Sequence, residues 1–326
     1  MSIGKRVDRK IECLYIFLSI YMQFHHILIR LLLILAISFL IFTIYNSWKK
    51  GVEGFGGFDQ TEPFLLKTGT ESYDNFYVEV YDDLMDSKKE TVKQANIIIK
   101  SVPIEKERDR ILDIGSGTGT MVKYLDSLGY QAEGLEQSDE MVKKSIDKYR
   151  VISIKQGTAL DPMQYDRAVF SHILCLNFTI YEFSDKLQLF KNCYSWLQGG
   201  GYFILHLVDR NTFHPIIPAA LGSSSDIEIE KNHSQITRSE IDFVGYTYKS
   251  LFDFMKGSHE VCHKESFIDK KTHNIRENER TLYMEGYRDI LDMAIKSGFI
   301  VRGNIPLENT GSLNKGQWLF ILERTL

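Results

Sequence analysis

The segment that most constrains the fold is residues 110–119, Arg-Ile-Leu-Asp-Ile-Gly-Ser-Gly-Thr-Gly. Its short apolar run predicts a buried parallel strand. The three glycines that follow predict a tight turn whose backbone can approach a ligand closely. Apolar residues then recur at helical spacing up to Gly129, which marks the end of a helix. Together, the strand, glycine turn and helix predict the nucleotide-binding corner of a doubly wound α/β sheet.

The spacing of the glycines distinguishes between ligands. A dinucleotide fingerprint, G-x-G-x-x-G, needs glycine at position 120, where this chain has Thr120. Here an acid, Asp113, comes before the glycines, and a carboxylate there suits a ligand with an ammonium group better than one with a pyrophosphate. The pattern resembles motif I of the class I S-adenosylmethionine-dependent methyltransferases. The resemblance implies S-adenosylmethionine as cofactor and a seven-stranded, Rossmann-like sheet of strand order 3-2-1-4-5-7-6. It also implies cofactor contacts from Asp113, Gly115, Ser116, Gly117 and Gly119.

A second acid supports this interpretation. Residues 131–136 read as a strand that ends in Glu136, 17 residues after Gly119. Rossmann-type folds place a carboxylate on a ribose diol at about this interval. Ser138 then predicts a helix N-cap. By resemblance, Glu136 is the ribose ligand and Gln137 and Met141 lie beside the cofactor; the alternative is a surface acid at a strand end.

The next two strands add weaker signals. Residues 151–155 predict a third strand, and the turn after it carries an adenine-binding acid in the family. Thr158 stands there instead, so the resemblance leaves mainly backbone contacts from Thr158 and Ala159. Residues 165–171 resemble motif IV, with a central strand over 168–170 and Ser171 after it. No N/D-P-P-Y/F sequence follows, which argues against methylation of adenine N6 or of glutamine.

Residues 73–84 form an aromatic helix similar to the "YD-x-x-Y-x-x-x-Y" helix that precedes motif I in several small-molecule methyltransferases. That likeness implies that Tyr77 or Tyr81 lines the cofactor site, and an amphipathic core helix is the alternative. Within a domain spanning residues 71–326, the insertion 208–285 alternates like strands and predicts a small antiparallel lid. Its last strand resembles "R-x-N-x-H-x-L-Y-M" of sugar-amine and glycine-type N-methyltransferases, with Arg280 in place of the histidine.

Methyl transfer from a sulfonium needs alignment and water exclusion, and a base only if the acceptor must lose a proton before attack. His172 and His206, at predicted strand ends, are the candidate bases; the alternative is that both are packed core histidines. His259, Cys262 and His263 lie on an alternating strand and would point to both faces, so we predict no metal site.

The N-terminal part predicts a membrane anchor. A basic segment, 1–10, precedes an apolar run over 31–48, and Lys49 and Lys50 follow it. This pattern predicts a single-pass transmembrane helix within residues 1–50, then a flexible linker over 51–70; a buried core helix is the alternative. The basic N-terminus would place the domain across the membrane. A helical hairpin or a reversed insertion would keep it in the cytosol, as would be expected from the scattered cysteines and a glycosylation sequon at Asn177 inside the domain.

The sequence as a whole thus predicts a membrane-anchored, cytosol-facing methyltransferase that acts on a small-molecule or lipid-proximal acceptor. A net charge of -4 without a basic stripe argues against a nucleic-acid partner. Two alternatives stay open: a catalytically inactive, methyltransferase-like scaffold that binds S-adenosylmethionine, and a Rossmann enzyme using NAD, which Thr120 disfavours.

Overall fold

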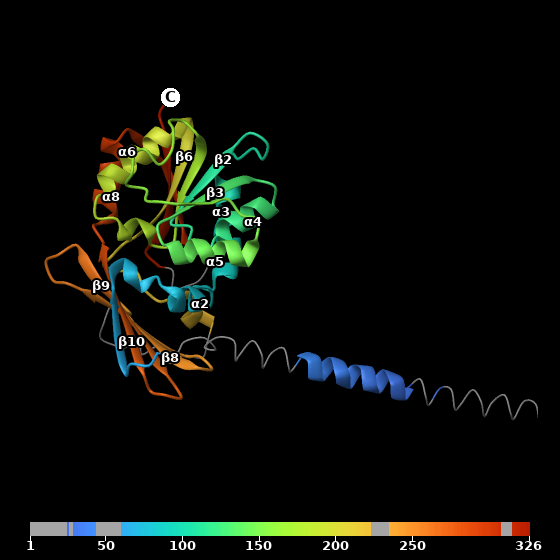
Figure 1. Cartoon of the computed structure of the whole chain (residues 1–326). Coiled ribbons are helices and arrows are strands. Elements are labelled where there is room, and N and C mark those ends of the chain that lie inside the picture. Colours follow the sequence, from blue (N-terminus) through green and yellow to red (C-terminus); the bar gives the residue numbers. More distant parts are fainter. Residues whose placement is uncertain (1–24, 26–28, 44–59, 223–234, 308–314) are drawn as a thin grey trace, which may run out of the picture. The chain divides into compact units, whose positions relative to one another are not determined.

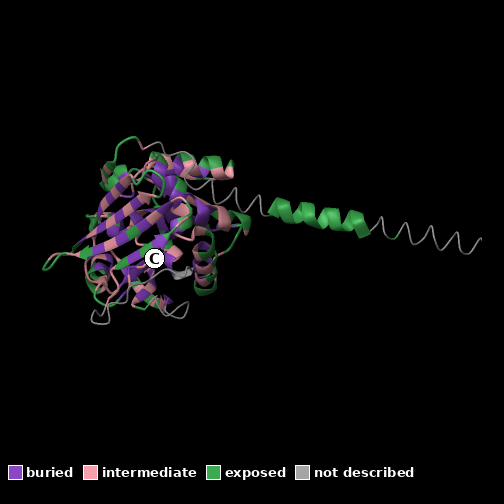
Figure 2. Cartoon of the chain, turned by 90° about the horizontal axis from the view of Figure 1, so that it is seen from below, coloured by how far each residue is buried: buried purple, intermediate pink, exposed green. Residues whose placement is uncertain are grey.

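The computed structural model describes residues 25, 29–43, 60–222, 235–307 and 315–326. The chain divides into two compact units, residues 1–56 and 57–326. In the first unit, residues 29–43 form a helix whose side chains are all exposed (Figure 2).

The predicted N-terminal transmembrane helix is therefore wrong. Within the described ranges, no helix is both long and apolar enough to cross a membrane. The predicted anchor covered an apolar run over 31–48, of which the structure describes residues 31–43. The flanking Lys49 and Lys50 and the first part of the predicted linker lie outside the described residues.

The second unit contains a seven-stranded sheet in the order β4-β3-β2-β5-β6-β12-β11, which confirms the predicted order 3-2-1-4-5-7-6. The strand β12 runs antiparallel to both of its neighbours, and the other pairs are parallel. The strands are β2 (Arg110–Ile114), β3 (Gln131–Glu136), β4 (Ile154–Gln156), β5 (Phe170–Cys175), β6 (Leu197–Val208), β11 (Phe299–Pro306) and β12 (Gln317–Arg324).

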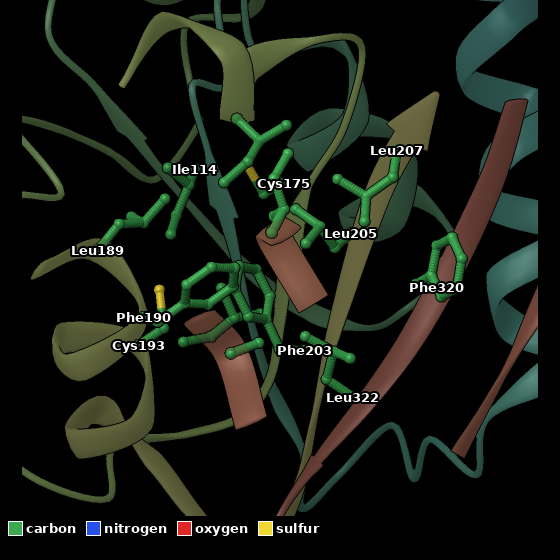
Figure 3. Close-up of a cluster of buried hydrophobic side chains, with 14 of the residues drawn as sticks. Ile114, Cys175, Leu189, Phe190, Cys193, Phe203, Leu205, Leu207, Phe320 and Leu322 are labelled. Atoms are coloured by element: carbon green, nitrogen blue, oxygen red, sulfur yellow. The ribbon is translucent and has the colours of Figure 1, made fainter. Parts of the chain in front are cut away.

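Helices cover both faces of this sheet (Figure 1). Residues of α6 (Lys186–Trp196) and α8 (Tyr287–Lys296) pack on one face, where Phe190 and Phe203 belong to the larger hydrophobic core (Figure 3). Residues of α3 (Ser87–Ser101) and α4 (Thr120–Ser127) pack in a second core on the other face. The helix α5 (Asp139–Tyr149) follows β3.

A second, five-stranded sheet has the order β1-β10-β9-β8-β7, and we call it the lid sheet. It confirms the antiparallel sheet predicted within residues 208–285. One strand comes from the predicted linker: residues 64–68 are not a flexible segment but β1, which pairs in parallel with β10, Phe64 opposite Ile275. The strands are β1 (Phe64–Thr68), β7 (Arg238–Asp242), β8 (Tyr246–Phe254), β9 (Glu260–Asp269) and β10 (Ile275–Tyr283).

The helix α2 (Asn75–Leu84) links the two sheets, and a 3-10 turn, η1 (Gly69–Ser72), leads into it. Asp74 caps α2 by accepting a hydrogen bond from the backbone N–H of Tyr77, and the same carboxylate pairs with the buried Arg276 of β10 at 2.9 Å. Phe76 contacts Phe267 of β9 edge to face. These contacts hold α2 against the lid sheet. The short elements η2 (Thr179–Glu182) and α7 (Pro218–Gly222) complete the described fold.

Candidate active site

The glycine turn connects β2 to α4 at the carboxyl end of the parallel strands. Gly115, Gly117 and Gly119 all have positive φ angles, +68°, +54° and +76°. A Cβ atom at Gly119 would lie 2.5 Å from Ile152 Cδ1, so this glycine allows the turn to pack on the β4 side. A Cβ at Gly117 would instead lie 3.5 Å from the ring of Tyr81. The ring of Tyr81 therefore closes the space in front of Gly117 to about the width of one methyl group.

Glu136, at the end of β3, is fixed to this turn by backbone donors. Its two carboxylate oxygens accept hydrogen bonds from the N–H groups of Gly117 and Ser138, each at 2.8 Å. Ser138 in turn caps α5 by accepting a hydrogen bond from the N–H of Met141. Burial raises the pKa of Glu136, opposed by the backbone hydrogen bonds. The carboxylate of Glu136 thus connects the end of β3 to the glycine turn and to the start of α5.

Asp113 is the second acid of the site and is only 5% exposed. Burial, and then the neighbouring charge of Glu136, raise the pKa of Asp113 to about 8. At this pKa Asp113 is mainly protonated at pH 7. A cationic group placed beside it would favour the ionised form.

The helix α2 is fastened over the glycine turn. The hydroxyl of Thr118 donates to Asp82 of α2 at 2.6 Å, and Lys148 of α5 forms an ion pair with the same carboxylate. The ring of Tyr81 consequently faces the turn at Gly117. The backbone carbonyl of Tyr73 accepts a hydrogen bond from Ser138, which ties the start of α2 to the cofactor side as well.

A cavity of about 700 Å³ opens between these elements and the lid sheet. Its volume falls in the range of small-molecule and cofactor sites, roughly 300–1,000 Å³. The lid sheet contributes Phe252, His263, Arg280 and Leu282. Predicted cofactor residues that line the cavity are Asp113, Gly115, Ser116, Gly117, Glu136, Gln137, Met141, Thr158 and Ala159. The structure therefore brings these residues to one cavity, and their individual roles stay predictions.

The lining is strongly acidic. Its carboxylates belong to Glu90, Asp113, Glu136, Asp139, Glu140 and Glu182, whereas Arg280 is the one basic side chain apart from His263 among the described lining residues. Burial lowers the pKa of His263 to about 4, so its imidazole is neutral at pH 7. An acidic cavity favours a ligand that carries positive charge.

Two predicted residues, Ser171 and His172, do not reach the cavity. The predicted central strand covered 168–170, but β5 begins at Phe170 and continues to Cys175. His172 therefore pairs with Ile111 in the first half of the strand. The hydroxyl of Ser171 bonds the backbone of Arg110, at the end of the sheet away from the glycine turn. Burial also lowers the pKa of His172. The structure therefore keeps both residues away from the cavity because β5 begins later than predicted, and their roles as cofactor contact and base stay predictions.

His206, Tyr77 and Gly119 are also absent from the cavity lining. His206 is buried on β6, where its Nε2 lies 3.2 Å from Oε1 of Gln317 and burial lowers its pKa to about 4. A neutral, enclosed imidazole outside the cavity does not fit the predicted base. Tyr77 points into the lid sheet, where its hydroxyl donates to Glu265, and Gly119 acts in packing. The neighbouring tyrosines Tyr73 and Tyr81 line the cavity instead.

The sequence did not assign a buried polar cluster in the lid sheet. Arg280 donates to Glu265 at 2.7 Å and to the hydroxyl of Tyr77 at 2.9 Å, and the hydroxyl of Tyr248 donates to Glu265 at 2.7 Å. Strand alternation puts Arg280 on the same face of β10 as Arg276. Whether Glu265 lies on that face too depends on the pairing of β9 with β10, which sets Glu265 beside Asn278. Among the described residues, no group of three potential metal ligands is found.

Comparison with known proteins agrees with this geometry. Residues 112–205 match the family model described as "Methyltransferase domain". A search of curated proteins found no significant match.

Solved structures match the fold over most of the chain. An S-adenosylmethionine-dependent methyltransferase from Clostridium acetobutylicum has a TM-score of 0.56 at 15% identity, covering 77% of this chain and 99% of its own. The CcbJ methyltransferase from Streptomyces caelestis gives 0.59 at 13%, covering 78% and 98%. CalS10 from Micromonospora echinaspora, an amino pentose methyltransferase with S-adenosylmethionine bound, gives 0.51 at 20%, covering 78% and 98%.

Proposed function

We propose, from the premise that this chain contains a methyltransferase domain with the class I S-adenosylmethionine-dependent fold, that it methylates a small molecule bound in the cavity. The observation that carries the proposal is a pair of acids beside a glycine turn. Asp113, Gly117 and Glu136 all line the cavity. A ligand with an ammonium group and a ribose diol fits this pair of carboxylates.

The residues present fit S-adenosylmethionine. Asp113 is placed to pair with an ammonium group, and Glu136 to accept hydrogen bonds from ribose hydroxyls. Thr158 and Ala159, in the turn after β4, also line the cavity and would hold the adenine ring through backbone groups. The cofactor supplies an activated methyl group on a sulfonium, so that the leaving sulfur becomes a neutral thioether.

The contribution of the protein is therefore mainly positioning. The cavity encloses cofactor and acceptor, aligns the attacking atom with the methyl group and limits water, which are the effects that such an in-line displacement requires. The attacking atom gains the methyl group, the carbon–sulfur bond breaks with its electron pair on sulfur, and any extra proton leaves the acceptor afterwards. Within the described lining, His263 is the one imidazole, and its low pKa makes it a poor base.

Calorimetric titration of the full chain with S-adenosylmethionine, S-adenosylhomocysteine and NAD tests this proposal. We expect micromolar binding of the first two and no binding of NAD. A folded chain that binds none of the three contradicts the proposal. Turnover is tested separately, by following S-adenosylhomocysteine formation with a small-molecule extract; binding without turnover would favour the inactive scaffold.

A further inference from the structure

The end of the cavity formed by the lid sheet contains a buried guanidinium. Arg280 lies on β10 and is 8% exposed, and its side chain lines the cavity. Because strand side chains alternate, Arg276, Asn278 and Arg280 share one buried face of the sheet. Arg276 is used in the ion pair with Asp74 and does not line the cavity. Of these two arginines, only Arg280 reaches the space where an acceptor would bind.

Arg280 is held rigidly through one of its nitrogens. Its Nη2 donates to Glu265 Oε2 at 2.7 Å and to the hydroxyl of Tyr77 at 2.9 Å, and lies 3.3 Å from His263 Nδ1. The guanidinium also lies over the rings of Tyr73 and Tyr77, 4.8 and 5.0 Å from their centroids. Two aromatic faces and one ion pair therefore fix its orientation.

Both carboxylate oxygens of the anionic partner, Glu265, already accept hydrogen bonds from the protein. Glu265 is completely buried, and its Oε1 accepts hydrogen bonds from Tyr248 and Tyr77 while its Oε2 accepts from Arg280. Its carboxylate thus has a protein donor on each oxygen. Unused donors on this buried face belong to Asn278, through Nδ2, and to Arg280, and of these two residues only Arg280 lines the cavity.

That remaining capacity is not used by the protein. Nε of Arg280 is buried without a hydrogen-bond partner, and all of the hydrogen bonds that Arg280 makes to described residues come from Nη2. An unpartnered donor on a buried charged group is costly, so such groups are normally paired. A cavity residue with a fixed orientation and idle donors is what a site for a ligand oxygen requires.

We propose that Arg280 is a specificity-determining residue that binds a carboxylate of the methyl acceptor, an inference that rests on the proposed function. A singly charged carboxylate oxygen can accept a charge-assisted hydrogen bond from the guanidinium. Glu265 and Glu182 are the other charged groups at this end of the cavity, and they would repel a doubly charged phosphate more strongly. The acceptor is accordingly an acid-bearing small molecule.

The test uses pairs of probes that differ only in charge: glycine and glycinamide, β-alanine and β-alaninamide, benzoate and benzamide. Each is titrated, by ligand-observed NMR, into the full chain saturated with S-adenosylhomocysteine. We expect at least one acid to bind about tenfold or more tightly than its amide, as for loss of a charge-assisted hydrogen bond. Equal binding within each pair, or no binding of any acid, overturns the inference.

Substitutions then test whether Arg280 causes the preference for the acid over its amide. Arg280→Lys keeps the charge but loses the planar guanidinium, and the double change Arg280→Met with Glu265→Gln removes both charges, so no buried carboxylate is left without its cation. We expect Arg280→Lys to weaken the preference and the double variant to reduce it to about twofold or less. Arg276→Lys, four residues along the same strand, is the matched control and should keep it.

Each outcome decides a separate question. Failure of the folded chain to bind S-adenosylhomocysteine contradicts the proposed function. Binding of S-adenosylhomocysteine with no preference for acids contradicts only the role of Arg280. A preference that persists in the double variant, or in Arg280→Lys if the double variant does not fold, also contradicts it.

Discussion

Asp113 makes the stability of the domain depend on pH in a way that one substitution should remove. Its pKa in the folded chain is about 8, against an ordinary value of 3.8. Between these values the unfolded chain has lost a proton that the folded chain still holds. Stability is therefore fully present below about pH 4 and falls as pH rises toward 8, by about 1.4 kcal/mol per pH unit. At pH 7 the accumulated cost is at most about 4 kcal/mol.

Asp113→Asn keeps the size of the side chain and removes its titration. We expect the free energy of unfolding of the variant, minus that of the wild type, to rise steadily from pH 4 to 8 and then level off. Urea denaturation followed by circular dichroism at half-unit pH steps measures this difference. Asp126→Asn, at a side chain that is 58% exposed, is the matched control. A difference that stays flat, or that shrinks as pH rises, would refute the reasoning.

The same carboxyl links cofactor binding to protons. A ligand ammonium beside Asp113 favours the ionised form, so binding of S-adenosylmethionine at pH 7 should release about one proton from the wild type and none from Asp113→Asn. Calorimetry in buffers with different ionisation enthalpies measures this number. Equal proton release from both proteins would remove Asp113 from the ammonium site.

Two further substitutions test the site, and a third tests a buried ion pair outside it. Gly117→Val fills the space in front of Tyr81 and should abolish binding of S-adenosylhomocysteine in calorimetry, while circular dichroism shows that the protein is still folded. Unchanged affinity would contradict a role for the glycine turn in binding. Glu136→Ala should weaken that binding by about 1.5–3 kcal/mol, and a loss below about 0.5 kcal/mol would exclude the ribose role. Lys186 is fully buried and paired with Glu285 at 2.7 Å, so Lys186→Met should cost about 3–5 kcal/mol of unfolding free energy in urea; a change below 1 kcal/mol would show that the pair is dispensable.

The seven-stranded sheet could be predicted because its information is local. The glycine turn after β2 and the acid at the end of β3 each fix a strand end, and right-handed crossovers then leave few possible strand orders. The same strand ends form the predicted cofactor-binding side of the cavity. For this reason Asp113, the glycine turn and Glu136 meet there.

The features that the sequence did not predict depend on where a strand begins or on contacts between residues far apart in the sequence. The stretch from Ala168 to Leu176 is apolar except for Ser171 and His172, so the start of β5 could not be located from hydropathy, and these two residues lie at the end of the sheet away from the glycine turn. The lid cluster depends on the register of β9 against β10, which sets Glu265 opposite Asn278. That register is set by the turn between the two strands together with the burial of one face, and neither strand's own residues specify it.

The pairing of β1 with β10 determines where this domain can be cut. Asn274 donates from its side chain to the carbonyl of Gln60, and Gln60 donates to Ile275, so contacts to the lid sheet begin at least as early as residue 60. A fragment starting at residue 71, where the sequence placed the domain boundary, would lose β1 and leave β10 as a bare edge strand. Exposed edges invite pairing with other chains. Truncation at residue 71 should therefore yield an aggregating protein in which the strand that positions Arg280 is the first to be disturbed.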